Sequence, residues 1–494
     1  MAALSWILVA LVIVGGLPLV TGCLQFALAG CHCLRRRRAT ALTEFPRVAV
    51  IVPAWNEANV IARTLDQLMT LEYPVDRLRV YVVDDGSSDG TPELVCAKAL
   101  EYPGRVFHLR RENGGQGKSH TINHGLERIR ADAWYEAVLV IDADVIFTPA
   151  SLRRMTRHFA DPAIGAVTAY IKEGSRPANY MKRFIAFEYV TAQAGARRAQ
   201  NVLGAQACLA GGAQLIKRES LEAIGGVVDT STLAEDTVTT FRIQLAGKRV
   251  VFEPNAIVWA EEPSDVVGLW KQRVRWARGN VQVTIRFRRV WLARRSAGPL
   301  GGVCFALIWF SVTLMPLLMI GASSGLIGLF LSDPRLAERT SGGIWGVSAL
   351  AYLFITVSSM SIDPGCARRT WREALAFPGL VSLAIMLHSV SPQLYSVEGG
   401  RLLRDAGIGP SAGLSTGLVL FTYFWLAGSM LAAYAVKLLA ASGRCQRLIA
   451  PLVYIVGYGP LLCAITAAAY IAELRGSELR WDKTEKTGAV GEFA

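Results

Sequence analysis

Four short polar motifs in the sequence combine residue types that could bind a nucleotide and a metal ion. They are Pro53–Glu57 (PAWNE), Asp84–Gly90 (DDGSSDG), Gly114–Lys118 (GGQGK) and Asp142–Asp144 (DAD), and each follows a short apolar run. Any one of them could be only a turn or a helix cap, because Asp, Asn, Ser and Gly favour both. Carboxylates combined with a Gly-Lys pair suit a divalent cation, a sugar nucleotide and its diphosphate.

Two competing interpretations of these motifs fail on spacing. A phosphate-binding P-loop ending in Gly117–Ser119 would need a glycine where Glu112 stands. A calcium loop starting at Asp85 would need a glutamate where Cys96 stands. No G-x-G-x-x-G follows the first apolar run, so a dinucleotide fold has no support. Asp142–Asp144 is therefore interpreted as a site for a hard cation, Mg²⁺ or Mn²⁺.

The apolar runs before the motifs predict the elements that position them. The sequence alternates between β-branched runs and segments of helical periodicity, which predicts a doubly wound, mostly parallel α/β sheet. Ligands of such sheets bind beyond the carboxyl ends of the strands, where these motifs stand. The predicted strands are 47–53, 78–83, 105–109 and 137–141, and the predicted helices are 56–70, 92–101, 118–130 and 149–160.

The composition indicates a membrane protein. Of 494 residues 52% are hydrophobic and 18% are charged, which excludes disorder, and the length excludes a small disulfide scaffold. The apolar excess is concentrated in spans, whereas residues 45–295 have an ordinary soluble composition. The apolar stretches are 1–33, 300–331, 343–361, 376–396, 412–440 and 448–473.

Charge next to these stretches predicts an orientation. Met1–Cys33 is long enough to cross a hydrocarbon core, which takes about 20 residues, and Arg35–Arg38 follow it. The positive-inside tendency predicts a plasma-membrane protein with its N-terminus outside and its soluble domain cytoplasmic. The net charge of +13 gathers at this boundary, so we expect no nucleic-acid partner. Stretch 376–396 could cross the membrane or lie at its interface, which leaves five or six crossings and the side of the C-terminal tail open.

Five motifs in order carry a resemblance to a known family. They are Pro53–Glu57, Asp84–Asp89, Asp142–Asp144, Glu235-Asp236 and Gln272–Trp276 (Q-x-x-R-W). The sequence resembles processive family 2 glycosyltransferases, the membrane synthases of polysaccharides such as poly-N-acetylglucosamine, hyaluronan and chitooligosaccharides. The resemblance implies a cytosolic, GT-A-like α/β domain with a helical transmembrane region. It implies these parts: an N-terminal transmembrane helix at 1–34, the catalytic domain at 45–262, amphipathic interfacial helices at 263–298, four or five spans at 299–473 and a polar tail at 474–494.

The resemblance also implies donor-binding residues. Asp85 would contact uracil or ribose, and Pro53, Trp55 and Glu57 would line the nucleoside pocket. Asp144 would bind Mg²⁺ or Mn²⁺ with Asp142 supporting the donor, and Gln272 and Arg275 would reach the donor diphosphate. Lys118 would lie near the nucleotide; the alternative is a solvated lysine at a helix start.

The remaining assignments concern the acceptor and the reaction. Asp236 resembles the general base of a Glu235-Asp236 pair, and the alternative is an N-cap carboxylate. Trp276 would stack on the acceptor sugar. Gly211, Gly212 and Cys208 would line the acceptor end, unless that loop is only a tight turn. The helix predicted at 263–290 also carries arginines expected to bind anionic lipid, namely Arg273, Arg278, Arg286, Arg288 and Arg289.

The function implied is an inverting transferase that polymerises a β-linked polysaccharide from a UDP-sugar, UDP-N-acetylglucosamine by preference. Its partners would be the donor, the growing polysaccharide and the lipid bilayer. One alternative is a non-processive transferase that makes a glycolipid from a nucleotide sugar. A second is a transporter or receptor with a degenerate nucleotide-binding domain, which the complete set of carboxylates disfavours.

Overall fold

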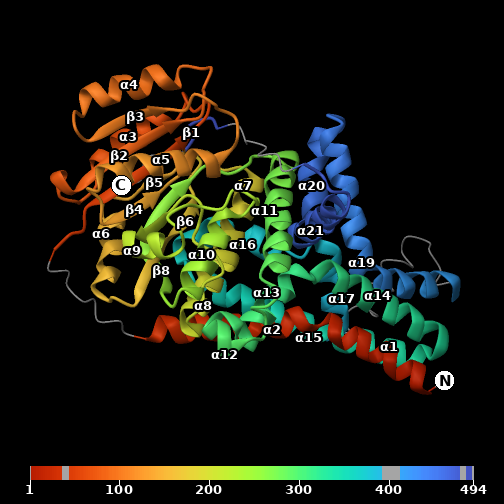
Figure 1. Cartoon of the computed structure of the whole chain (residues 1–494). Helices are drawn as coiled ribbons and strands as arrows, with labels where there is room; N and C mark the ends of the chain where they lie inside the picture. Colours follow the sequence, from red (N-terminus) through yellow and green to blue (C-terminus); the bar gives the residue numbers. More distant parts are fainter. Residues whose placement is uncertain (1, 36–43, 392–411, 479–485, 492–494) are drawn as a thin grey trace. The chain divides into compact units, whose positions relative to one another are not determined.

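The computed structural model describes residues 2–35, 44–391, 412–478 and 486–491 (Figure 1). The chain divides into two compact units. The sheet unit comprises Leu28–Ala306 with Gly476–Ala494, and the helical unit comprises Met1–Ala27 with Leu307–Arg475. Of the predicted basic cluster after the first apolar stretch, residues 36–38 lie outside the described residues.

An eight-stranded sheet forms the centre of the sheet unit, in the order β3-β2-β1-β4-β7-β6-β8-β5. Strands β3, β2, β1 and β4 pair in parallel. Strand β7 runs antiparallel to its neighbours β4 and β6, and β5 runs antiparallel to β8. The predicted fold class, a mostly parallel α/β sheet with apolar helices, is confirmed. The strands are β1 (Val48–Ala54), β2 (Leu78–Asp84), β3 (Val106–Arg110), β4 (Ala137–Val140), β5 (Ile146–Phe147), β6 (Ile164–Glu173), β7 (Gln214–Lys217) and β8 (Arg249–Ala260).

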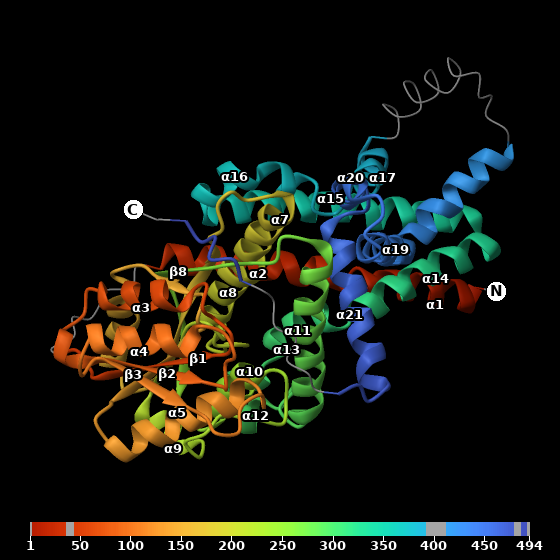
Figure 2. The ribbon, with the colours of Figure 1, turned by 90° about the horizontal axis from the view of Figure 1, so that it is seen from above.

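Three helices cover the parallel half of the sheet, namely α3 (Ile61–Met69), α4 (Thr91–Glu101) and α5 (Lys118–Asp132). They lie beside β1–β3 in both ribbon views (Figures 1 and 2). The chain steps outward from β1 to β3 and then returns to β4, so the right-handed crossover rule puts α3 and α4 on one face and α5 on the other. The strand order reverses between β1 and β4, and in such sheets ligands bind at the carboxyl ends of the strands at this point, where the motifs stand.

The other helices of the sheet unit carry the second half of its sequence. The expected helix at 56–70 begins only at Ile61, because Asn56 has a φ of 54° and the N-cap residue Val60 has a non-helical φ of −129°. The helix expected at 149–160 ends as a 3₁₀ turn after Thr156. These helices are α6 (Ser151–Thr156), α7 (Tyr180–Glu188), a π-helical turn (Tyr189–Gly195), α8 (Ala196–Leu203), α9 (Arg218–Ala223), α10 (Glu235–Leu245), α11 (Val266–Arg286) and α12 (Arg294–Ala297).

By length and composition, four helices among the described residues could cross a membrane, or up to seven segments if each bent helix pair is one span. The four are Ala3–Leu34, Met315–Ser332, Pro334–Ile362 and Thr416–Ala441. The helices concerned are α1 (Ala2–Gly15), α2 (Leu17–Leu34), α13 (Val303–Thr313), α14 (Met315–Ser332), α15 (Pro334–Ile362), α16 (Pro364–Leu375), α17 (Leu380–Val390), α19 (Ala412–Ala441), α20 (Gln446–Val456) and α21 (Tyr458–Leu474).

Packing within the helical unit is close where residues are small. A Cβ on Gly325 of α14 would lie 2.9 Å from the carbonyl oxygen of Leu8 in α1, so glycine is needed for this approach. The described part of the ambiguous stretch, residues 376–391, contains the short α17, which is bent by 80° from the basic α16. Residues 392–396 of that stretch lie outside the described residues.

Candidate functional site

The loops after β1 and β2 hold each other in place. The backbone N–H of Asn56 donates to Oγ of Ser87 at 2.9 Å, and the N–H of Ser88 donates to Oδ1 of Asn56 at 2.8 Å. The N–H of Glu57 donates to Oγ1 of Thr91 at 2.8 Å. The motifs Pro53–Glu57 and Asp84–Gly90 therefore form one polar edge of the sheet.

Asp85 is buried at this edge and is bound by a residue that sequence reasoning missed. Its carboxylate forms an ion pair with Arg111 and accepts the N–H of Gly115 at 3.1 Å. A Cβ on Gly114 would lie 2.2 Å from the carbonyl oxygen of Asp85, so the glycine loop can pass only because it lacks side chains there. The Arg111 contact has no local signal in the sequence, since its partner lies on a neighbouring strand end.

Lys118 begins α5 and points into the site. Its ammonium group forms an ion pair with Asp142, donates to the carbonyl of Gly211 at 3.2 Å and lies 3.9 Å from Oε1 of Glu235. The solvated alternative is wrong, because only 11% of this side chain is exposed. Burial by itself would lower the pKa of Lys118, but the two carboxylates outweigh it and the pKa is raised.

A pocket of about 320 Å³ lies beside these groups. This volume is at the lower end of the usual range for ligand sites. Nε of Arg275 is buried without a hydrogen-bond acceptor among the described residues, which suits an anionic ligand. The pocket is lined by Trp55, Asp85, Gly115, Gln116, Gly117, Lys118, Ser119, His120, Thr230, Thr232, Leu233, Glu235 and Arg275.

Glu235 and Asp236 open helix α10. Ala234 is the N-cap and no side chain caps it, so the N-cap alternative for Asp236 is wrong. Asp236 Oδ1 instead accepts the N–H of Thr237 at 2.6 Å. Burial first, and then the neighbouring carboxylate of Asp236, raise the pKa of Glu235 to about 7, against the opposing effect of Lys118.

The loop carrying Gly211 and Gly212 closes over these charges. A Cβ on Gly211 would lie 3.3 Å from both Asp236 Oδ2 and the Nζ of Lys118, and one on Gly212 would lie 3.3 Å from Asp142 Oδ2. The glycines thus leave the backbone in contact with the carboxylates and the ammonium group. Gly211 and Gly212 do stand in a tight turn, and this turn leads directly into strand β7.

Cys208 lies in the same loop. Burial, and then the nearby Asp236 carboxylate, raise the pKa of its thiol well above the ordinary value. The side chain donates to the carbonyl of Leu209 at 2.9 Å. At neutral pH this thiol is neutral, so it can line a site as a small apolar group but is not a nucleophile.

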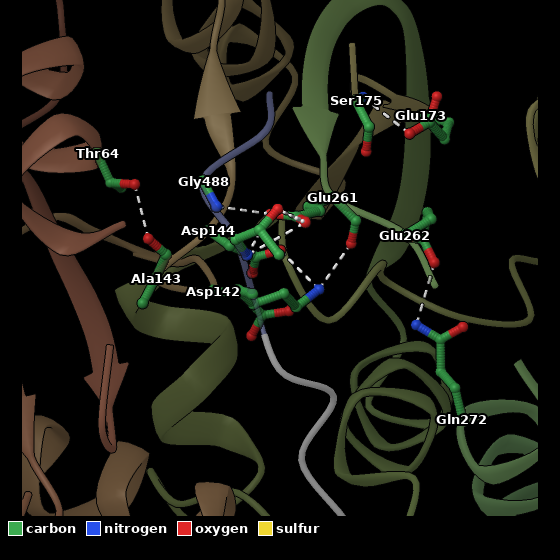
Figure 3. Close-up of polar contacts among 12 residues, drawn as sticks. Thr64, Asp142, Ala143, Asp144, Glu173, Ser175, Glu261, Glu262, Gln272 and Gly488 are labelled. Atoms are coloured by element: carbon green, nitrogen blue, oxygen red, sulfur yellow. Dashed lines mark hydrogen bonds and ion pairs between the residues drawn. The ribbon is translucent and has the colours of Figure 1, made fainter. Parts of the chain in front are cut away.

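Asp142 and Asp144 follow β4, as the motif predicted. Only 11% of the Asp144 side chain is exposed, and the ammonium group of Lys486 lies 2.8 Å from its Oδ2 (Figure 3). Among the described residues no group of three or more His, Cys, Asp or Glu could hold a metal. Asp144 with donor phosphate oxygens fits a hard cation, and the lysine already shows that a positive charge is accepted there.

Helix α11 carries the Q-x-x-R-W motif and is tied to the end of β8. Gln272 is buried and its amide donates to Oε2 of Glu262 at 3.1 Å (Figure 3), while Glu262 also accepts the hydroxyl of Tyr189. The side-chain oxygen Oε1 of Gln272 in turn accepts a hydrogen bond from Nη1 of Arg273 at 2.9 Å. Trp276 is 37% exposed. Sequence reasoning missed Glu262 and Tyr189.

The lipid-binding expectation is wrong for three arginines of this helix, because each is used inside the sheet unit. Arg273 is buried and pairs with Glu188 at 3.0 Å. Arg278 donates to two backbone carbonyls, that of residue 477 at 2.7 Å and that of residue 478 at 3.0 Å. Arg286 pairs with Asp229 at 2.7 Å. Carboxylates far away in sequence neutralise Arg273 and Arg286, and distant backbone carbonyls hold Arg278, which a helical pattern cannot reveal.

The structure thus brings seven of the fifteen residues chosen from the sequence to the pocket or into contact with Lys118. Those lining the pocket are Trp55, Asp85, Lys118, Glu235 and Arg275, and Asp142 and Gly211 contact Lys118 directly. Others lie outside the residues that line it. These are Pro53, which is paired with Val83 in the sheet, and Glu57, Asp144, Asp236, Gln272 and Trp276.

Comparison with known proteins adds relatives with named activities. The chain is 34% identical over 253 residues to the probable glycosyltransferase YdaM of Bacillus subtilis, covering 50% of this chain and 58% of that protein. It is 30% identical over 256 residues to a poly-beta-1,6-N-acetyl-D-glucosamine synthase of Staphylococcus aureus, covering 52% and 60%. The chain therefore spans less than two thirds of the length of these relatives.

A solved structure extends the likeness. The mannosyltransferase PcManGT from Pyrobaculum calidifontis, in complex with GDP-Man and Mn²⁺, is 25% identical with a TM-score of 0.55. The match covers 74% of this chain and 99% of that one. Residues 46–279 match the family described as glycosyltransferase like family 2. The segment that contains the motifs and the pocket, residues 46–279, is therefore a glycosyltransferase family 2 domain with a GT-A-like fold.

Proposed function

We propose that the chain is a membrane-embedded, inverting glycosyltransferase that extends a β-linked polysaccharide from a UDP-sugar. The observation that carries this proposal is the meeting of Glu235, Asp236 and Lys118 around Gly211 beside the pocket. UDP-N-acetylglucosamine is the preferred donor, and this choice rests on the likeness to the poly-N-acetylglucosamine synthases.

In this proposal the pocket takes the donor. Trp55 and Asp85 contact the nucleoside, with Pro53 and Glu57 shaping the loop around it, and Arg275 offers its buried guanidinium to the diphosphate. Asp144 holds Mg²⁺ or Mn²⁺, supported by the Mn²⁺ complex of the similar mannosyltransferase. A cation bound there would offset the charge of the leaving diphosphate.

Asp236 acts as the general base. It takes the proton of the acceptor hydroxyl as that oxygen attacks the anomeric carbon, and the bond from that carbon to the diphosphate oxygen breaks. UDP leaves on the opposite side, so the configuration is inverted. Glu235 holds a proton part of the time at neutral pH, which limits repulsion between the two neighbouring carboxyl groups.

The acceptor lies against the remaining residues in this proposal. Trp276 stacks on its terminal sugar, Gln272 supports the donor side of the same helix, and Gly212 and Cys208 line the loop that faces it. The growing chain then passes into the apolar helices. The positive-inside tendency places the sheet unit in the cytoplasm and the N-terminus outside the plasma membrane.

The test is UDP release by the purified, detergent-solubilised protein with UDP-N-acetylglucosamine and Mn²⁺. Asp236→Asn should abolish release while UDP still binds, and Asp161→Asn, at an exposed carboxylate paired with Arg249, serves as the control. Normal turnover by the Asp236 variant would remove the base assignment. No release with any UDP- or GDP-sugar would reject the function as a whole.

A second candidate is a non-processive transferase that makes a glycolipid from a nucleotide sugar. The observation in its favour is the likeness to a mannosyltransferase whose structure contains GDP-Man. Sizing of the product separates the two, because a lipid carrying one sugar would favour this candidate and a ladder of long chains would favour polymer synthesis.

A further inference from the structure

Residues 486–491, here called the docked segment, lie across the site next to Asp144. The Nζ of Lys486 is 2.8 Å from Asp144 Oδ2 and donates to the carbonyl oxygen of Glu261 at 2.6 Å. Only 16% of the Lys486 side chain is exposed. A positive charge is therefore inserted, with little solvent, at the carboxylate proposed to bind the metal (Figure 3).

The backbone of the docked segment is held around the carboxylate of Glu261. That carboxylate accepts the N–H of Thr487 at 3.1 Å, its hydroxyl at 2.6 Å and the N–H of Gly488 at 3.0 Å. Three donors on one carboxylate fix the residue next to Lys486 and so aim its side chain. This arrangement is more than a chance approach of one flexible lysine.

The far end of the docked segment adds to the edge of the sheet unit. Ser175 and Val490 form an antiparallel bridge, the N–H of Arg176 donates to the carbonyl of residue 489 at 2.8 Å, and the N–H of Gly491 donates to the carbonyl of residue 174 at 3.1 Å. Arg63 donates to the carbonyl of Gly491 at 3.1 Å. The side chain of Val490 is buried. The segment is thus anchored at both ends, with its first residue against Asp144.

We infer that the docked segment is a built-in competitor of the divalent cation. Lys486 occupies Asp144 when no donor is bound, and the metal–nucleotide complex binds only when the ammonium group leaves. The reason is charge: an ammonium group hydrogen-bonded to one carboxylate oxygen repels a second cation on the same carboxylate. This inference rests on the proposed metal-binding role of Asp144.

The competition predicts which interactions change on binding. When the metal–nucleotide complex binds, the contact of Lys486 with Asp144 breaks first. The three hydrogen bonds to Glu261 and the bridge at Val490 then either stay formed and hold the backbone, or break and release it. Displacement of the lysine alone would leave the segment as a cover over the donor. Release of the backbone would open the site, and amide exchange at Thr487, Gly488 and Gly491 distinguishes these two forms of the same competition.

The experiment measures Mn²⁺ binding by electron paramagnetic resonance on the full-length, detergent-solubilised protein without donor. Lys486→Met should tighten Mn²⁺ binding by about tenfold, because a like charge next to the site is removed. Thr487→Val, which loosens the segment but keeps the lysine, should give a smaller gain. Lys248→Met is the control, since this partly exposed lysine donates to the carbonyl of residue 162, and the Mn²⁺ affinity of this variant should equal that of the native protein.

Equal Mn²⁺ affinity in the native and Lys486→Met proteins would overturn the inference. So would binding that Asp144→Asn leaves unchanged, because the cation would then sit elsewhere. UDP release is measured independently, so failure of this inference can be told apart from failure of the proposed function. If the native protein releases UDP but Lys486→Met binds Mn²⁺ no more tightly, only the competition is rejected. If no donor supports UDP release, the proposed function is rejected.

Discussion

The guanidinium carbon of Arg273 lies 3.8 Å from the centroid of the Trp276 ring. The same guanidinium group pairs with Glu188 at 3.0 Å and donates to Gln272 at 2.9 Å. Arg273, which occupies a variable position of the Q-x-x-R-W motif, therefore contacts both its first residue, Gln272, and its last, Trp276. A buried cation over an indole face restrains the ring, and Glu188 neutralises that cation.

Arg273→Lys should impair use of the acceptor more than binding of the donor. Lysine keeps the charge but cannot donate to Gln272 and Glu188 while lying flat on the ring. Loss of the cation–π contact should lower kcat/KM for the acceptor by about 3- to 30-fold. The dissociation constant for UDP should stay near that of the native protein. Arg288→Lys, on the exposed part of the chain after α11, is the control, and an equal loss in both variants would contradict a positioning role.

Lys118→Met should destabilise the sheet unit. The substitution leaves Asp142 and Glu235 without their buried cation, and breaking a buried pair in this way costs about 3–5 kcal/mol. A lower thermal midpoint of the purified protein would report this. The double variant Lys118→Met/Glu235→Gln should recover part of the loss, because the uncompensated charge is removed. Lys98→Met is the control: Lys98 pairs with Asp66 and Glu101 near the surface, where a pair is worth at most about 1 kcal/mol.

Three of the four parallel strands, β1, β2 and β4, were predictable because each is a largely apolar run of about the length that a buried strand needs, whereas β3 (VFHLR) is buried only at its first residue. Strand β1 is buried at all seven positions, and its observed bounds differ from the prediction by one residue. Strand β5 has only two residues, so the local pattern carries almost no signal for it, and β7 is a four-residue strand with a polar residue at each end. Their antiparallel pairing is set by neighbours far along the chain.

The same limit applies to the site. Residue types and spacing identified Asp85, Lys118 and Asp142, because the carboxyl ends of neighbouring strands must meet, and the family resemblance added Glu235. They could not identify which charges neutralise each other. Glu188 is 85 residues from Arg273. Lys486 lies in what the sequence showed only as a polar tail, and its contact with Asp144 depends on tertiary structure alone.

Glu235 should make stability depend on pH. Its pKa is about 7 in the folded protein, against 4.5 as the ordinary value. Between these values the folded state holds a proton that the unfolded chain releases. The contribution of Glu235 to the free energy of unfolding is therefore complete at low pH and is lost as pH rises through about 7. Glu235→Gln stays neutral throughout. Its thermal midpoint relative to the native protein should therefore increase between about pH 5 and about pH 8. Glu222→Gln, at a half-exposed carboxylate, is the control, and a difference that falls with pH would contradict the assignment.

Gly114→Ala should weaken binding of the nucleotide. The new Cβ would lie 2.2 Å from the carbonyl oxygen of Asp85 and 3.0 Å from Cα of Gly86, so the loop that donates from Gly115 to Asp85 must move. Overpacking of this kind costs about 1–3 kcal/mol. If the strain falls on the bound form, the dissociation constant for UDP should rise by about 5- to 150-fold. Titration calorimetry of the purified protein measures this.

Gly90→Ala is the matched control at the end of the neighbouring loop, because its nearest neighbour would be 3.9 Å away and its φ of −72° suits alanine. Unchanged binding in the Gly114 variant would show that the donor does not depend on the Asp85 loop, and the nucleoside contact would then have to be assigned elsewhere in the pocket.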